Sequence, residues 1–204
     1  MQALAQRVSS AKICINAKTH ASIKEGILAY VCFEKDDEED VVDKFISKII
    51  NFSFFKGDNN IMSASLKEIG GELMIISQFT LSAVTDKGNK PSFHRAAETD
   101  KANFLYNSLI RGLNESAIRF QSGVFGSDMD IHSVNAGPVP FHLRCKFMTD
   151  QLESFSLEVY AWIEDHCPSS IGTSMPVSEE FLASSAINFH TTASHTLYEA
   201  VVSK

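Results

Sequence analysis

The sequence predicts an α+β domain with mostly antiparallel strands, either as a sheet or as a barrel with two helices outside it. Three observations lead to this prediction. Segments with strand periodicity occur throughout the first 145 residues, and two longer segments with helical periodicity interrupt them. The composition then changes near residue 150. The 204 residues are 44% hydrophobic, which is enough to bury one core.

The strands are expected along the whole of this first part. Residues 2–8 and 11–17 alternate as two short strands, with the turn "SSA" between them. Residues 26–34 form a continuous apolar run whose length suits a buried strand. The segment "GGELMIISQFTLSA" is the strongest strand signal in the chain. Further short strands are expected near residues 118–124, 129–134 and 139–145.

Two segments have the period of an amphipathic helix. The first is "KDDEEDVVDKFISKIINF", in which acids fill the first turn, where the helix dipole favours negative charge. The second covers residues 98–115. Their apolar stripes are Val41, Val42, Phe45, Ile46, Ile49 and Ile50 in the first helix, and Ala102, Leu105, Tyr106, Leu109 and Leu113 in the second.

The chain after residue 150 differs from the part before it. Residues 151–204 contain seven acids and a single base, Lys204. An amphipathic helix is expected to begin near Asp150 and to end at Pro168, and the last 25 residues have no clear period. We therefore expect a domain over residues 1–150 and an acidic extension over 151–204 that is helical or partly disordered, with a role that the sequence does not indicate.

Composition excludes several classes of protein. No apolar run is long enough to span a membrane, and the first residues lack the layout of an export signal. The cysteines are far apart, so reduced thiols in a cytoplasmic protein are expected; they are Cys14, Cys32, Cys145 and Cys167. The histidines have no metal-site spacing, so neither a metal nor another cofactor is expected.

The net charge of −7 is unevenly distributed, because most of the excess negative charge lies in the extension. The first 150 residues are close to neutral and can still carry a basic patch. Lys87, Lys90 and Arg95 lie in one polar loop that also contains glycine and proline. A nucleic-acid partner therefore remains compatible with the composition.

Two short stretches contain residues that ordinary strands avoid. "SQFTL", from Ser77 to Leu81, ends a very apolar strand with hydroxyl and amide side chains. Taken alone, it could be a strand that leaves the core with its polar groups solvated. In "NAGPVPFHL", Gly137 and Pro138 interrupt an alternating pattern, although proline gives up a ladder hydrogen bond.

Together these stretches resemble the D-aminoacyl-tRNA deacylase family, also called D-tyrosyl-tRNA deacylases. The resemblance covers about residues 1–145, in order and with matching spacing. It is carried by "QRVSSA", "GGELMIISQFTL", "KGNKPSFHRAA", "GVFGSDM" and "NAGPV". The pair formed by "SQFTL" and "NAGPV", some 55 residues apart, is far more specific than either motif alone.

The resemblance implies a homodimer with a barrel-like fold and active sites at the subunit interface. Such an enzyme hydrolyses the ester that joins a D-amino acid to the 3′-terminal adenosine of tRNA. The family's Gly-Pro bond, here Gly137-Pro138, would be cis and would enter the partner subunit's site, where backbone atoms reject the β-carbon of an L-amino acid. Since glycine has no β-carbon, glycyl-tRNA, including glycine mischarged on tRNA-Ala, is expected to be a substrate too.

The resemblance also assigns roles to the residues of "SQFTL". The backbone N–H groups of Phe79 and Thr80 would hold the ester carbonyl and its developing oxyanion. Ser77 and Gln78 would bind the terminal nucleotide. A water assisted by the ribose 2′-hydroxyl is the expected nucleophile, and the Thr80 side chain is the alternative.

Four further positions match supporting residues of the family. Phe125 and Met129 would line the adenine pocket, although ordinary core packing would explain them as well. Arg7 would brace the Gly-Pro loop through its carbonyl groups, with Asn135 beside it. This chain has Pro140 where the family usually has threonine, so the bracing of the loop is the weakest part of the match.

Two other functions fit the same motifs. The first is a deacylase with relaxed chirality, which the departure at Pro140 suggests. The second is a non-catalytic module that binds the acceptor end of tRNA and leaves the charged tRNA intact. Rates of hydrolysis of D- and L-tyrosyl-tRNA would distinguish all three.

Overall fold

The computed structural model describes residues 1–57, 62–86 and 88–146. The chain divides into two compact units, Met1–Ser154 and Phe155–Lys204, and the described residues all belong to the first. The amphipathic helix and the acidic extension that the sequence predicts lie outside the described residues, so the domain boundary near residue 150 stays a prediction. Within the described residues, no helix combines the length and the apolar character that crossing a membrane requires.

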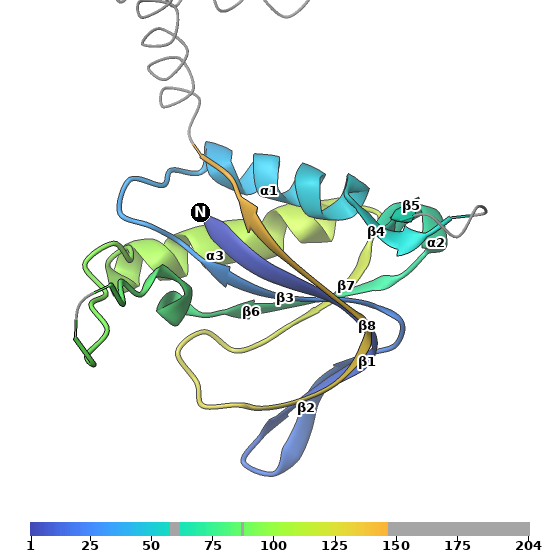
Figure 1. The fold of residues 1–204 in the computed structure, drawn as a ribbon, viewed down its shortest axis with the longest axis horizontal. Helices are drawn as coiled ribbons and strands as arrows, with labels where there is room; N and C mark the ends of the chain where they lie inside the picture. Colours follow the sequence, from blue (N-terminus) through green and yellow to red (C-terminus); the bar gives the residue numbers. More distant parts are fainter. Residues whose placement is uncertain (58–61, 87, 147–204) are drawn as a thin grey trace, which may run out of the picture. The chain divides into compact units, whose positions relative to one another are not determined.

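A mixed, strongly curved sheet forms the centre of the domain (Figure 1). Its path is β2-β1-β3-β6-β7, and β8 pairs with the other edge of β1. The strands β3, β6 and β7 are parallel, whereas the remaining pairs are antiparallel. The six strands are β1 (Gln2–Ile15), β2 (Lys18–Ile23), β3 (Gly26–Cys32), β6 (Glu72–Ser77), β7 (Arg119–Ser122) and β8 (Asp130–Arg144). The α+β, barrel-like class predicted from the sequence is confirmed.

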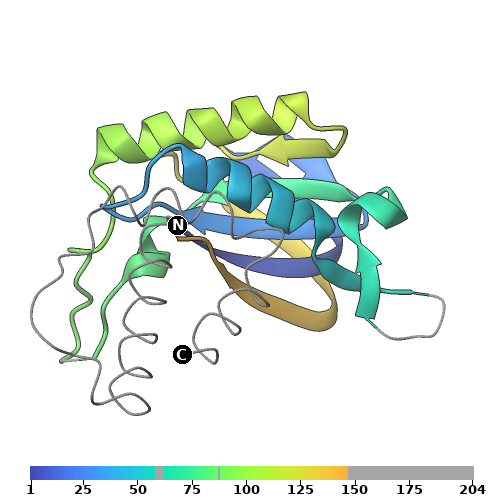
Figure 2. The same cartoon turned by 90° about the horizontal axis from the view of Figure 1, so that it is seen from above.

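Two helices cover one face of this sheet, as Figure 2 shows from above. They are α1 (Asp40–Asn51) and α3 (Thr99–Glu115). Their predicted apolar faces are confirmed, with Ile46 and Ala102 only partly buried. Both helices bury these faces against β1, β3 and β6 in one continuous apolar cluster. Between them the chain forms a hairpin of β4 (Ser53–Lys56) and β5 (Met62–Ser65) and the short helix α2 (Leu66–Ile69).

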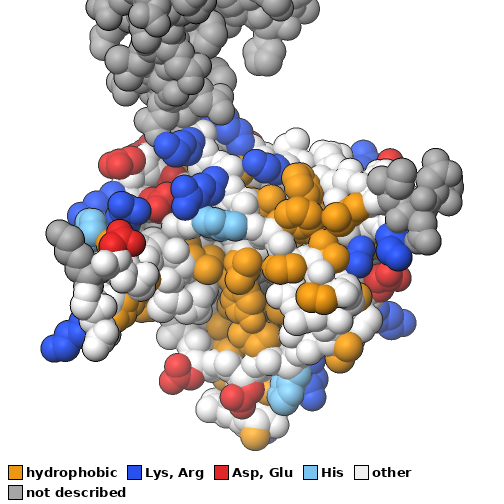
Figure 3. Space-filling model, viewed as in Figure 1, with side chains coloured by type: hydrophobic (Ala, Val, Ile, Leu, Met, Phe, Trp, Pro, Cys, Tyr) orange, Lys and Arg blue, Asp and Glu red, His pale blue; other side chains and the backbone are white. Residues whose placement is uncertain are grey.

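The opposite face of the sheet carries a second apolar cluster, built by strand residues alone. No residue of a helix belongs to this cluster among the described residues, and part of its margin stays accessible to solvent. Its buried members come from β1, β2, β3 and β6, and Met129 and Ile131 pack at its margin. Figure 3 shows hydrophobic side chains exposed across the middle of the face turned to the viewer. An exposed apolar area of this kind is typical of a contact surface.

The two strands predicted over residues 2–8 and 11–17 are a single strand, β1. The strand changes its partner instead of turning. Residues Gln2–Val8 pair with β3, and from Ala11 onward the strand pairs with β2. The exposed Ser9 and Ser10 mark this change of partner, so the polar "SS" in the sequence does not indicate a turn.

The strand β8 is likewise continuous, although two halves were predicted. Its pairing with β1 is irregular at the Gly-Pro position. Gln6 lies opposite Pro140 and Val8 opposite Asn135, so four residues of β8 face the single residue Arg7. The extra residues leave the ladder as a bulge, which lets a proline occur within a strand assignment. The Gly137-Pro138 peptide bond in this bulge is cis.

The strand predicted over "GGELMIISQFTLSA" ends at Ser77, and a 3₁₀ helix, η1 (Phe79–Ser82), replaces its last part. The Gln78 N–H donates to the Val31 carbonyl oxygen at 2.7 Å, which is the last backbone hydrogen bond to β3 among the described residues. Since β3 itself ends at Cys32, β6 has no neighbour on that side to continue with, and the chain turns there.

Candidate active site

The carboxyl ends of β3, β6 and β7 meet at one edge of the sheet, because these strands are parallel neighbours. Polar residues of the "SQFTL" motif follow β6, and the loop "GVFGSDM" follows β7. Crevices at the carboxyl ends of parallel strands are frequent ligand sites in sheets of this type. Figure 1 shows η1 and this loop at the same side of the domain.

The turn after β6 is fixed by its own side chains. The Gln78 side chain donates from Nε2 to Thr80 Oγ1 at 2.6 Å. The Ser82 hydroxyl donates to the Phe79 carbonyl oxygen at 2.9 Å, and the Ala83 N–H donates to that of Thr80. Ser77, at the end of β6, is partly buried. These short-range bonds hold the turn in one conformation.

Two backbone donors of this turn are available to a ligand. The N–H groups of Phe79 and Thr80 stand at the start of η1, where a helix has no internal acceptors to offer. No backbone or side-chain atom of the described residues accepts a hydrogen bond from either group. Adjacent, fixed N–H groups of this kind can bind a carbonyl oxygen that gains negative charge.

The loop after β7 is attached to the same edge. The Gly123 N–H donates to the Ile75 carbonyl, and the Tyr106 hydroxyl lies 3.2 Å from the Ile75 oxygen and 3.0 Å from the Gly123 oxygen. Tyr106 thereby joins β6 to the loop, and burial raises its pKa to about 12. In the helical pattern of the sequence Tyr106 counts only as an apolar residue, although a buried hydroxyl on a helix stripe requires a partner.

Phe125 and Met129, the predicted adenine residues, lie in this loop and are partly buried. The Phe125 ring lies 5.8 Å from that of Tyr106 and packs against the helix-covered core. Met129 packs against the second cluster, and a Cβ on Gly123 would come within 2.9 Å of its sulfur. Both residues combine core packing with an accessible part, so the adenine role stays a prediction.

Cys32 lies beside the turn, with its Sγ 3.6 Å from the Phe79 carbonyl oxygen. Burial raises the pKa of this thiol. A thiol acts as a nucleophile only as the thiolate, so the raised pKa argues against nucleophilic attack by Cys32.

The second predicted element, the bulge at Gly137-Pro138, is held by Arg7. The Arg7 Nε donates to the Ala136 carbonyl at 2.8 Å, and a terminal nitrogen donates to the Phe54 carbonyl at 3.0 Å. A Cβ on Gly137 would lie 2.7 Å from Val139 Cγ2 and 3.0 Å from the other terminal nitrogen of Arg7. Gly137 also has a φ of +141°, which few residues with a side chain adopt.

Asn135 and Pro140 flank this bulge. Asn135 pairs with Val8 through the strand register, and its exposed side chain forms no hydrogen bond to a described residue. Pro140 is opposite Gln6, where the ladder resumes. The Arg7 bonds reach Ala136 and Phe54, so they do not involve position 140.

The turn and the bulge do not meet within one chain. Arg7, which holds the bulge, pairs with Ile27 of β3, and Ile27 pairs with Leu73 of β6. Ser77, where the turn begins, lies four residues beyond Leu73 along β6. Four residues span roughly 13 Å along a strand, and three further steps of about 4.8 Å separate β8 from β6. Figures 1 and 2 show η1 and the middle of β8 on opposite sides of the domain.

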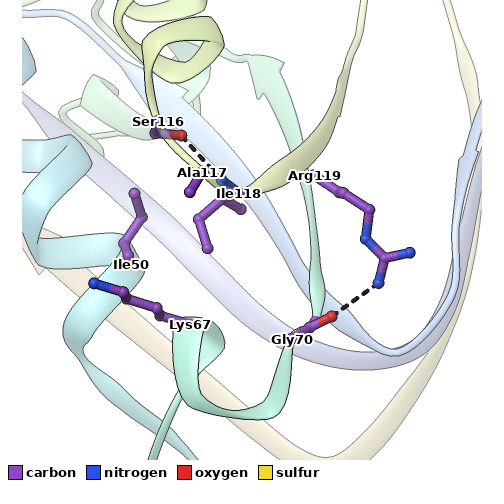
Figure 4. A pocket seen from close by; sticks show the side chains of 8 residues that line it. Ile50, Lys67, Gly70, Ser116, Ala117, Ile118 and Arg119 are labelled. Atoms are coloured by element: carbon purple, nitrogen blue, oxygen red, sulfur yellow. Dashed lines mark hydrogen bonds between the residues drawn. The ribbon is translucent and has the colours of Figure 1, made fainter.

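A cavity of about 440 Å³ lies at the opposite edge from the turn. Most of the residues that line it come from the segments just before β6 and β7, and its apolar lining residues include Ile50, Ala117 and Ile118 (Figure 4). Arg119 at its rim donates to the Gly70 carbonyl at 2.9 Å. This shallow apolar hollow contains none of the predicted site residues.

The described residues include no group of three or more His, Cys, Asp or Glu side chains that could hold a metal ion. Cys14, Cys32 and Cys145 are free and buried, and Cys167 lies outside the described part of the chain.

Comparison with known proteins decides the family. The sequence profile of the family described as D-Tyr-tRNA(Tyr) deacylase matches residues 4–144. The chain belongs to this family. A D-aminoacyl-tRNA deacylase of Pseudoalteromonas translucida is 43% identical over 143 residues, which are 70% of this chain and 99% of that relative. One from Flavobacterium psychrophilum is 41% identical over 147 residues, or 72% and 98% of the two chains.

Two solved structures share the fold of this chain. The structure of the c-Myc DNA Unwinding Element Binding Protein superposes with a TM-score of 0.68 at 31% identity, over 72% of this chain and 100% of that one. A probable eukaryotic D-amino acid tRNA deacylase, at 18% identity and a TM-score of 0.59, shares the fold. The alignments with the bacterial relatives leave more than a quarter of this deacylase-family chain unmatched.

Proposed function

We propose that this protein hydrolyses the ester bond of D-aminoacyl-tRNA and releases the free D-amino acid and the tRNA. The observation that carries the proposal is the pair of unpartnered N–H groups of Phe79 and Thr80, at the carboxyl edge of the sheet, in a chain that belongs to the deacylase family. Because aminoacyl-tRNA is used in translation, the protein would act in the cytoplasm, where it would proofread the charged tRNA by removing D-amino acids.

The turn supplies electrostatic stabilisation. The ester carbonyl oxygen accepts hydrogen bonds from the Phe79 and Thr80 N–H groups, which stabilise the negative charge that forms during attack. A water molecule assisted by the ribose 2′-hydroxyl attacks the carbonyl carbon, and the bond to the ribose oxygen breaks. That oxygen takes up a proton and becomes the free 3′-hydroxyl. An aminoacyl ester is reactive enough that positioning and an oxyanion site suffice.

Ser77 and Gln78 bind the terminal nucleotide in this proposal, with Phe125 and Met129 against the adenine. All four lie in the turn after β6 or the loop after β7, at one edge of the sheet. The contact between Gln78 Nε2 and Thr80 Oγ1 supports a positioning role for the Thr80 side chain. Thr80 has no histidine hydrogen-bonded to it among the described residues, so none of the described histidines is placed to activate its hydroxyl.

The bulge at Gly137-Pro138 selects the D-configuration. It is exposed, it carries no long side chain, and Arg7 holds its backbone. A rigid backbone surface beside the substrate α-carbon rejects the β-carbon of an L-amino acid by steric overlap. Glycine has no β-carbon, so glycyl-tRNA, including that mischarged on tRNA-Ala, is a substrate as well.

The proposed site is shared between two copies of the chain. Within one chain, the turn and the bulge are separated along and across the sheet, so the bulge of a second copy would have to complete the site. Partly buried apolar side chains at the margin of the second cluster, such as Tyr30 and Ile131, offer a surface for such a homodimer, and Figure 3 shows apolar side chains exposed on one face of the domain. Arg7 then supports the bulge that a subunit lends to its partner, and Asn135 flanks it.

Parallel hydrolysis assays with D-tyrosyl-tRNA and L-tyrosyl-tRNA test the proposal. We expect rapid loss of the D-ester and survival of the L-ester at the same enzyme concentration, and loss of glycyl-tRNA as well. Equal rates for both enantiomers would support the relaxed-chirality enzyme instead. Binding of the acceptor end with both esters intact would support the non-catalytic module.

A further inference from the structure

Two aromatic side chains beside the candidate oxyanion site are exposed although they contact each other. Phe79 is 56% exposed and Phe93 is 36% exposed. Their ring centroids lie 4.9 Å apart with an interplanar angle of 68°, which is an edge-to-face contact. Exposing two large apolar rings to water is unfavourable. A ligand that covers them would remove this apolar surface from water and would gain binding free energy from it.

The backbone fixes Phe93 in place without burying its ring. Ser92 and Val84 exchange backbone hydrogen bonds of 3.0 and 2.8 Å, which close the loop between them. The Ala97 N–H donates to the Phe33 carbonyl, and the Arg95 carbonyl accepts from the Lys35 N–H, so the residues directly after β3 anchor the segment on the other side. Figure 2 shows this green loop between η1 and the start of α3. The ring is therefore held ready for contact before any ligand arrives.

The same segment is basic. From Val84 to Ala97 the sequence has three Lys or Arg residues and a single acid, Asp86. The exposed side chains of Lys90 and Arg95 form no ion pair with any described residue. Aromatic rings on which bases stack, next to cations that attract phosphates, characterise surfaces that bind single-stranded nucleic acid.

We infer that Phe79 and Phe93 form a stacking platform for the unpaired nucleotides that precede the terminal adenosine of the tRNA, with Lys90 and Arg95 near their phosphates. The inference rests on the proposed function, since it needs an RNA end at the turn after β6. It assigns to Phe93 a contact with the RNA strand and no contact with the ester.

Phe93→Leu tests the platform, because leucine keeps an apolar group and removes the aromatic face. The matched control is Phe104→Leu, since Phe104 on α3 is 55% exposed and has no ring partner among the described residues. Each variant is assayed with D-tyrosyl-tRNA and with the minimal ester, D-tyrosyl-adenosine. We expect Phe93→Leu to raise KM for the tRNA about fivefold or more, as the loss of one stacked base does. KM for the minimal ester and both kcat values should stay unchanged.

Two results would overturn the platform. An equal change for both substrates would mean that Phe93 acts through the position of Phe79, and no change for either would mean that the rings do not touch RNA. Light scattering adds a third criterion, because a changed oligomeric state of Phe93→Leu would make the rings a subunit contact.

Binding of an uncharged RNA oligonucleotide ending in CCA separates this inference from the proposed function. Weaker binding by Phe93→Leu than by Phe104→Leu would support the platform even if no ester were hydrolysed, and equal binding would contradict it. Replacing Lys90 and Arg95 together by glutamine should reduce the slope of log affinity against log salt by about 1.4, if each cation contacts one phosphate. An unchanged slope would exclude the phosphate contacts.

Discussion

The turn after β6 and the bulge in β8 both present backbone to the proposed substrate, but the fold fixes them in different ways. The turn is held locally, by bonds such as that from Gln78 to Thr80. The bulge is held over a long range, by Arg7, which is 129 residues away from Ala136 in sequence. Backbone atoms can therefore be positioned by neighbouring side chains or by one distant cation, and the two arrangements should fail under different mutations.

Removal of one backbone donor from the turn should have the largest effect. Phe79→Pro deletes the N–H group at the first position of η1, where proline is well tolerated. Gln78 already lies in the extended region that a residue before proline favours over the helical one, with a φ of −148° and a ψ of 94°. We expect kcat for D-tyrosyl-tRNA to fall about 100- to 1,000-fold, as for other oxyanion donors.

Phe79→Leu is the matched control for this experiment, because it removes the same ring and keeps the N–H group. Steady-state kinetics of the two variants isolate the donor. If both lost kcat equally, the ring and not the N–H group would be responsible.

The bulge should be nearly as sensitive at Gly137. A Cβ there would overlap Val139 and approach Arg7, so the backbone has to shift. A displacement of about 1 Å in a catalytic arrangement can reduce the rate about 100-fold. Gly137→Ala should lose D-tyrosyl-tRNA hydrolysis by about that factor, whereas Gly70→Ala, with a φ of +61° and open space, should keep it. Normal activity of Gly137→Ala would show that the bulge does not contact the substrate.

Loss of the long-range support should have a smaller effect. Arg7→Ala leaves the carbonyls of Ala136 and Phe54 without their charged donor. We expect the ratio of D- to L-tyrosyl-tRNA hydrolysis to fall about tenfold, since one hydrogen bond to a charged group contributes about 1.5–3 kcal/mol. Lys12→Ala, at an exposed position of the same strand, is the control. An unchanged ratio would mean that the bulge is rigid without Arg7.

Some features of the fold and of these two regions could be predicted from the sequence, and others could not. Helical periods identified α1 and α3 because burial repeats along each helix, and an uninterrupted apolar run identified β3. The sequence pattern failed where pairing with other strands decides where a strand ends. An example is β1, which changes partners at Ser9 and Ser10 instead of turning. The residues of the turn and the bulge were nominated through the motifs, but the Phe54 carbonyl that holds Arg7 is a backbone atom and leaves no signal in a sequence.

The side chain of Thr80 should matter less than its N–H group. Thr80→Ala removes the acceptor of the Gln78 amide, and a neutral hydrogen bond is worth about 1 kcal/mol, or about fivefold in rate. Single-turnover hydrolysis should therefore slow by less than tenfold. If Thr80→Ala abolished turnover while binding stayed intact, the hydroxyl would be the nucleophile.

The pH dependence should show the smallest effect of all. Burial raises the pKa of both Cys32 and Tyr106, so the two groups stay protonated from pH 6 to 8. With no titrating base in the turn, log kcat should rise smoothly with pH and show no bell-shaped maximum. Cys32→Ala should give the same profile. An inflection that disappears in Cys32→Ala would assign catalysis to the thiolate.

Subunit complementation tests most directly whether turn and bulge act from different chains. Phe79→Pro and Gly137→Ala proteins, each expected to be about 100-fold or more less active than the wild type, are mixed, dissociated and reassembled. In a heterodimer of twofold symmetry one site combines the intact turn of one chain with the intact bulge of the other, so random re-pairing should restore about one quarter of the wild-type activity. A mixture no more active than its two components would contradict a site shared between subunits.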